Sequence, residues 1–162
     1  MNKKYLITVN RSIYDMEQAC ENRETLVWVD TGRLEKGDKV YLVAVGGGEQ
    51  AEVFGKATVG ISQSFHSKED VPGFAEGRWD DEWIGGLLAR PDGVNWRILD
   101  DVEMAASTVP IEDGRFTDKK FRGRMKGLTA LSKRDSEEME KCFVSPAEVA
   151  SAFRVYLHNI SY

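Results

Sequence analysis

The stretch LEKGDKVYLVAVGGGEQAEVFGKATVGI, residues 34–61, carries the clearest structural signal in the chain. Residues 36–38 are a turn signal, and residues 39–45 follow with the alternation of a strand. After the triple glycine at 46–48, alternate residues should line one face of a second long strand: Ala51, Val53, Gly55, Ala57, Val59 and Ile61. The pattern predicts a β-hairpin. A phosphate-binding loop is not indicated, because a helix follows such a loop and here a strand follows.

The residues before the hairpin predict two strands and a helix. Residues 5–9 are rich in β-branched and apolar side chains, which is typical of a central strand. Ser12 and Asp15 form a capping box, so we expect a helix over residues 12–23. A short extended stretch, residues 26–29, then delivers Trp28 to a turn.

The residues after the hairpin are less regular. Residues 62–77 lack a periodic pattern, and a connection of this length inside a compact domain is often functional. We expect one strand over residues 84–89 and another extended segment over residues 96–104. The candidate core residues of that segment are Trp96, Ile98, Val102 and Met104.

Two helices are expected near the end of the chain. Ser132 with Asp135 forms a capping box for a helix of about ten residues. Ser145 and Pro146 begin the second, since proline is favoured at the first helical position. Its apolar stripe contains Val149, Phe153, Tyr156 and Leu157.

Length and composition favour a single globular domain over residues 1–162. Apolar residues make up 41% and charged residues 30% of the sequence, as in soluble proteins. No apolar run approaches the roughly 20 residues of a membrane span. Cys20 and Cys142 belong to no metal-binding or disulfide pattern, so we interpret both as buried thiols in a reducing compartment. We therefore expect a cytoplasmic protein that needs neither a metal nor a cofactor.

The stretch GRWDDEWIGGLLA, residues 77–89, sets two tryptophans among acidic residues. Because charged residues resist burial, at least one of Trp79 and Trp83 should face a cleft. Trp28 also lies just before polar, turn-forming residues. We interpret the three indoles as gathering around one small, flat ligand; the alternative is that all three are ordinary core or rim residues.

Charge is distributed unevenly along the chain. The net charge of −5 argues against nucleic-acid binding by charge alone. Residues 115–134, however, hold eight basic side chains and one acid, interleaved with glycine and phenylalanine. Such a run is either a solvated face or a loop that follows a phosphate backbone.

The sequence contains no recognisable catalytic constellation. A nucleophile with its base, a metal cluster and a suitably spaced carboxylate pair are all missing, as are the GxSxG and HExxH motifs. We therefore expect a binding module rather than an enzyme. An enzyme or a small-metabolite binder that uses Asp80 and Asp81 is a further alternative.

In the order of its elements the chain resembles the PUA-like superfamily, and within it the EVE and YTH domains. The EVE-like features are LEKGDKVYL at 34–42 and VFGKA at 53–57. The YTH-like features are Val27-Trp28 with Thr31 just after, and WDDEWIG at 79–85, which is one residue shorter than that family's spacing. The likeness covers roughly residues 5–105 and implies an α+β fold, a twisted, barrel-like mixed β-sheet flanked by helices.

The resemblance also implies a function, namely binding of one modified nucleobase in nucleic acid. Trp28, Trp79 and Trp83 would form an aromatic cage for the flipped base, and Asn10 and Asp30 would bind its polar edge. Basic residues before the helix at Ser132 would contact phosphates: Lys119, Lys120, Arg122, Arg124 and Lys126. The expected ligand is DNA carrying methyladenine or a methylated cytosine, and the expected role is the targeting module of a methyl-dependent restriction system with a partner nuclease or motor. The alternative is a PUA-like protein that binds tRNA or rRNA.

Overall fold

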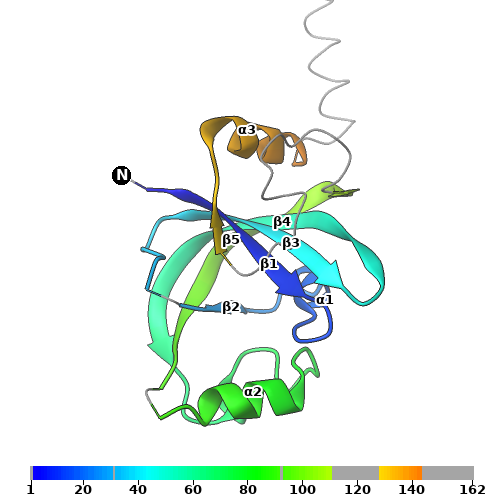
Figure 1. Ribbon diagram of the computed structural model, residues 1–162. Coiled ribbons are helices and arrows are strands. Elements are labelled where there is room, and N and C mark those ends of the chain that lie inside the picture. Colours follow the sequence, from blue (N-terminus) through cyan, green and yellow to red (C-terminus); the bar gives the residue numbers. More distant parts are fainter. Residues whose placement is uncertain (1, 31, 92, 111–127, 144–162) are drawn as a thin grey trace, which may run out of the picture.

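A mixed sheet of six strands, in the order β2-β5-β4-β3-β1-β6, curls into a half-barrel (Figure 1). The computed structural model describes residues 2–30, 32–91, 93–110 and 128–143. The parallel pair is β1 with β3, and the other neighbours are antiparallel. The strands are β1 (Lys4–Asn10), β2 (Leu26–Val29), β3 (Lys39–Gly46), β4 (Glu49–Ser64), β5 (Asn95–Pro110) and β6 (Leu128–Ala130). The helices are α1 (Met16–Glu21), the 3-10 turn η1 (Lys68–Asp70), α2 (Asp81–Leu88) and α3 (Lys133–Lys141).

The predicted hairpin is confirmed as β3 and β4, but its second strand does not keep one face. Register shifts interrupt the pairing of β4 with both of its neighbours. Such bulges add an unpaired residue and redirect the side chains that follow. Val53 therefore packs on the outer face of the sheet, whereas Ala57 and Val59 lie on the inner face. Ile61 is 57% exposed, so the expectation of one continuous apolar face was wrong.

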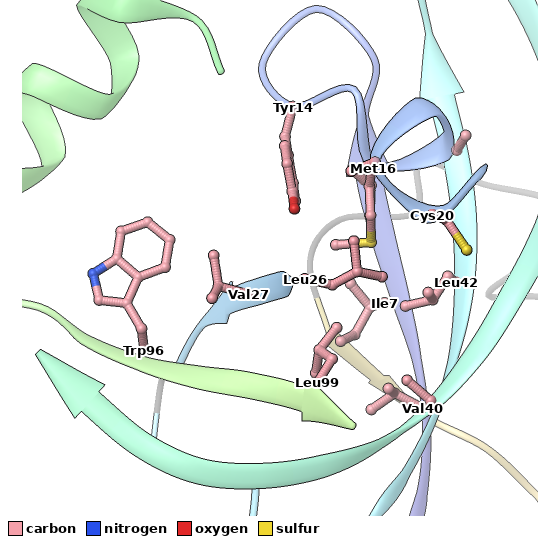
Figure 2. Close-up of a cluster of buried hydrophobic side chains, with 14 of the residues drawn as sticks. Ile7, Tyr14, Met16, Cys20, Leu26, Val27, Val40, Leu42, Trp96 and Leu99 are labelled. Atoms are coloured by element: carbon pink, nitrogen blue, oxygen red, sulfur yellow. The ribbon is translucent and has the colours of Figure 1, made fainter. Parts of the chain in front are cut away.

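The main hydrophobic core fills the concave side of the sheet. Figure 2 shows Ile7, Val40 and Leu42 from the strands meeting Met16 and Cys20 from the α1 segment. Strand β5 contributes fully buried Trp96, as predicted. Val102 and Met104, expected in the core, are instead 37% and 42% exposed, because β5 at that point extends beyond β2.

Helix α1 is shorter than the predicted span of residues 12–23. Its N-cap is Asp15, whose carboxylate accepts a hydrogen bond from the Gln18 backbone N–H at 3.2 Å. Residues 11–13 instead form a turn, and Tyr14 forms an isolated bridge with Trp79, in which Asp15 N donates to Arg78 O and Asp80 N donates to Ile13 O. A tertiary pairing thus replaces the first helical turn that the capping box predicted.

Helix α3 begins where the sequence predicts it and covers the outer face of the sheet. The Ser132 side chain accepts a hydrogen bond from the Asp135 backbone N–H at 3.1 Å. Near the other end of α3, Glu140 contacts Lys56 Nζ at 2.7 Å and accepts a hydrogen bond from the Tyr41 hydroxyl. Partial burial favours the neutral acid, but Lys56, Tyr41 and the charge of Lys39 together outweigh it and lower the pKa of Glu140 to about 2.

Candidate functional site

The segment that carries Trp83 is a helix, so the strand predicted over residues 84–89 was wrong. Asp80 is the N-cap of α2, and its carboxylate accepts a hydrogen bond from the Trp83 backbone N–H at 2.9 Å. Asp81 and Glu82 occupy the first turn, where the helix dipole favours negative charge. The acidic cluster is therefore a helix start, and it fixes the backbone of Trp83 directly.

Three aromatic rings stack beneath the start of this helix. Tyr14 and Trp79 lie with their ring centroids 3.7 Å apart and their planes 4° apart, and Trp79 and Trp83 lie 5.7 Å apart with a 7° interplanar angle. Trp79 is only 7% exposed, and its indole N–H donates to Pro72 O at 2.8 Å. Because stacked and buried rings have little freedom, Trp79 holds Trp83, the more exposed ring, in one orientation.

An ion pair anchors the segment before α2 that bears Trp79. The Arg78 guanidinium contacts Glu24 at 2.8 Å, with both side chains less than one-fifth exposed. The hydrogen bonds from Arg78 lower the pKa of Glu24, more than burial raises it. The connection predicted over residues 62–77 proves to begin after Ser64, where β4 ends, and to contain η1. The pair ties its end to the residues that precede β2.

Trp28 reaches the same region from β2, in register with Arg97 on β5. The Arg97 guanidinium donates to Asp30 Oδ2 at 2.9 Å and to the Leu34 carbonyl at 3.0 Å. The other carboxylate oxygen of Asp30 accepts from the Gly32 backbone N–H at 2.8 Å. This network fixes the turn after Trp28 and positions Leu34.

Trp28 and Trp83 line one pocket, whose volume is about 210 Å³. Both rings are half-buried and pack against the edge of the main core. The pocket opens between the end of β2, helix α2 and the first residue of β6. The lining residues are Trp28, Val29, Leu34, Trp83, Leu87, Arg90 and Leu128. Arg90 is the charged residue of this lining.

The structure brings some of the predicted site residues together and separates others. Trp28 and Trp83 share the pocket, whereas Trp79 packs behind Trp83 as a core residue and is not among the residues that line this pocket. Asp30 is only 10% exposed and faces Arg97. Asn10 lies at the end of β1, where its side chain accepts from the Ser12 backbone N–H at 2.9 Å. The predicted phosphate contacts Lys119, Lys120, Arg122, Arg124 and Lys126 lie outside the described residues.

Sequence reasoning missed five wall residues: Val29, Leu34, Leu87, Arg90 and Leu128. The signal for two of them was present: Trp83, Leu87 and Arg90 are spaced i, i+4, i+7, which places them on one side of a helix. The assignment of a strand hid this spacing. Leu34 had no comparable signal in the sequence. Its place in the pocket depends on a hydrogen bond from the distant Arg97 guanidinium to the Leu34 carbonyl.

The pocket combines two flat apolar faces with one cationic donor. That arrangement suits a planar heterocycle that stacks on indole and presents a hydrogen-bond acceptor to Arg90. In the described part of the chain, no group of three or more His, Cys, Asp or Glu side chains is placed to bind a metal ion. Within the same ranges, no helix has the length and apolar character that a membrane crossing needs.

Comparison with known proteins shows similarity in structure and not in sequence. No protein-family model matches the chain, and no curated protein matches it. A mutant form of the ASCH protein of Zymomonas mobilis superposes with a TM-score of 0.57 and 11% identity, over 86% of this chain and 98% of that one. The N-terminal domain of Staphylothermus marinus McrB gives 0.57 and 8%, over 87% and 94%. Rpa0253 of Rhodopseudomonas palustris gives 0.50 and 14%, over 87% and 92%. At these identities the likeness concerns the fold, and the chain has a PUA-like fold, as its sequence resemblance predicts.

Proposed function

We propose that this protein binds one modified base of a nucleic acid in the pocket between Trp28 and Trp83. The observation that carries the proposal is the pocket itself. Its volume is about 210 Å³, and two indoles and one arginine are among the residues that line it. Since a water molecule occupies about 30 Å³ of the liquid, this volume equals about seven waters. That is room for a single base ring system and not for a whole nucleotide.

The energies of such a site match what base binding requires. Stacking one base on an aromatic ring contributes about 1–3 kcal/mol, which is comparable to the cost of removing a base from its stack. One additional buried methyl group adds only about 0.8 kcal/mol. Selectivity for a methylated base therefore depends on how closely Trp28, Trp83 and Leu87 enclose the ring. Trp79, stacked behind Trp83, favours a close fit because it holds that indole in place.

Arg90 supplies the polar contact in this proposal, in place of Asn10 and Asp30. It is exposed at the end of α2 and lines the pocket. A guanidinium offers donors only, so it would bind a carbonyl oxygen or ring nitrogen of the base, or its phosphate. Leu128, which also lines the pocket, lies two residues after the basic stretch of residues 115–126 in sequence, which supports a phosphate-binding role for that stretch.

The expected polymer is DNA that carries methyladenine or a methylated cytosine, and the expected setting is a methyl-dependent restriction system. Both expectations rest on the sequence resemblance to EVE and YTH domains. In this setting the protein selects the site, and a nuclease or motor in another domain or chain acts on it. Structured RNA is the competing ligand, and the titration described next distinguishes it from modified DNA.

The test is a fluorescence-anisotropy titration with oligonucleotides that differ in one methyl group. Single-stranded and duplex DNA with 5-methylcytosine or N6-methyladenine are compared with their unmodified forms and with a structured RNA. We expect Trp83→Ala and Trp28→Ala each to weaken binding of the preferred oligonucleotide about 5- to 150-fold, the equivalent of losing one stacking contact. Trp83→Phe should retain most of the affinity.

The matched control is Phe74→Ala, which truncates a half-buried aromatic that is not part of the pocket lining. It should leave affinity within about twofold of the wild type. Equal affinity of the wild type for modified and unmodified strands contradicts modified-base recognition. A preference for the structured RNA over every DNA supports the competing assignment.

A further inference from the structure

An apolar groove lies on β5, separate from the pocket of Trp28 and Trp83. Its floor contains Val102 and Met104, which are 37% and 42% exposed, and the buried thiol of Cys20. The groove measures about 660 Å³, the volume of about 22 water molecules. Charged residues from the α1 end and from β5 form its rim: Glu21, Arg23, Glu24 and Glu103. A space of this size accommodates several apolar side chains of a covering segment.

The backbone edge beside this groove has no strand partner in the described part of the chain. Pairing of β2 with β5 ends at Leu26 and Leu99, whereas β4 pairs with the other edge of β5 past Met104 as far as Pro110. An open edge with exposed aliphatic side chains promotes pairing with other chains unless something covers it. The groove therefore lies where a folded protein needs a cover.

The chain leaves α3 next to this same edge. Ala106 N on β5 donates a hydrogen bond to Cys142 O at 3.0 Å. Residues 144–162 follow at once, and their sequence predicts the amphipathic helix with the stripe Val149, Phe153, Tyr156 and Leu157. A helix over 145–157 is about 20 Å long. The strand from Ala106 back to Val102 spans only about 13 Å, so the segment is long enough to cover it.

We propose that residues 144–162 dock on the groove of Val102 and Met104, with the apolar stripe of their helix against the floor. Three observations carry the assignment: the exposed aliphatic side chains, the unpartnered edge, and the departure of the chain beside Ala106. The segment of residues 111–127 and a second copy of the protein are the other occupants that the experiment distinguishes. The assignment does not depend on nucleic-acid binding.

Cysteine cross-linking in the full chain tests the position of the segment. Burial, with a contribution from the charge of Glu21, raises the pKa of the native Cys20 thiol to about 11, so an introduced pair is used. Under mild oxidation, Met104→Cys with Phe153→Cys should form an intramolecular disulfide at least about tenfold faster than Ile61→Cys with Phe153→Cys. Ile61 is exposed on β4 and is not part of the groove lining. Equal rates, or cross-linked dimers as the main product, overturn the proposal.

Hydrogen exchange supplies a second measurement that needs no cysteine. Phe153→Asp should accelerate amide exchange over residues 101–106 about 30-fold, the equilibrium factor that corresponds to about 2 kcal/mol for one buried Phe side chain. Ser151→Asp adds the same charge on the opposite side of the helix and should change exchange less than twofold. If both variants, or neither, accelerate exchange, the groove is covered by something other than this stripe.

Discussion

Replacing Asp30 by asparagine separates a structural role of this carboxylate from a role in ligand binding. The structure places Asp30 against Arg97, with side chains only 10% and 18% exposed. Breaking a fully buried ion pair costs about 3–5 kcal/mol. Asparagine keeps one acceptor oxygen, and Arg97 keeps its bonds to the Gly60 and Leu34 carbonyls at 3.1 and 3.0 Å. We therefore expect a loss of about 2 kcal/mol, the value of one charge-assisted hydrogen bond.

Urea unfolding followed by tryptophan fluorescence measures this loss. With an m-value of about 2 kcal/mol/M, a loss of about 2 kcal/mol lowers the midpoint by about 1 M. Affinity for the preferred oligonucleotide, measured under conditions where the variant is folded, should change less than about threefold. Asp81→Asn is the matched control: its partner is Lys68 and its side chain is 66% exposed, so the cost should stay below about 1 kcal/mol. Unchanged stability together with a large loss of affinity would refute the structural role and restore Asp30 to the base edge.

Three further predictions concern helices α2 and α3. The pKa of Glu140 is about 2 in the fold against the ordinary 4.5, so its contribution to stability is complete above about pH 4.5 and is lost as pH falls toward 2. Because the Glu140 side chain is 37% exposed, solvent screening reduces this contribution to about 1–2 kcal/mol. In urea unfolding, Glu140→Gln should lower the free energy of unfolding by that amount at pH 7 and change it little at pH 2. Asp80→Ala removes the N-cap bond to Trp83 and should cost about 1 kcal/mol and weaken oligonucleotide binding, measured by unfolding and anisotropy. Gly86→Ala should stabilise α2 by about 0.5–1 kcal/mol in thermal unfolding, since an added Cβ meets nothing within 4 Å.

Local sequence signals were sufficient for those parts of the fold whose contacts are local. The hairpin of β3 and β4 joins strands that are adjacent in sequence, and the Ser132 cap of α3 acts within one turn, so both were predicted. The parallel pairing of β1 with β3 and the position of β5 between β2 and β4 depend on contacts between distant segments. Sequence periodicity carries no information on such pairings, and the resemblance predicted a mixed, barrel-like sheet without saying which strands are neighbours.

The exposed residues of β5 show that a sequence pattern alone does not determine burial. Val102 and Met104 alternate in the sequence as core residues of a strand do, but residues 101–104 are all exposed in the structure. Burial, however, needs a neighbouring element as well as a pattern, and β2 is only four residues long. Trp96, which lies opposite Val29 of β2, is fully buried, whereas residues beyond Leu99 have lost that neighbour.

The misassignment of α2 explains why the site was only half predicted. Gly85 and Gly86 weaken helix propensity, and the acids around Trp79 and Trp83 suggested only that at least one of the two indoles faces a cleft. In the structure those acids are the cap and the first turn of a helix, so they mark where the helix begins and say nothing about the burial of Trp79. Once the segment is helical, Trp83 and Leu87 stand one turn apart and face Trp28 across the pocket, while Trp79, before the cap, is directed to Tyr14. The candidate site is thus built on a helix with a stacked ring behind Trp83, and residues placed on a helix and supported by packing are held more precisely than residues on a loop.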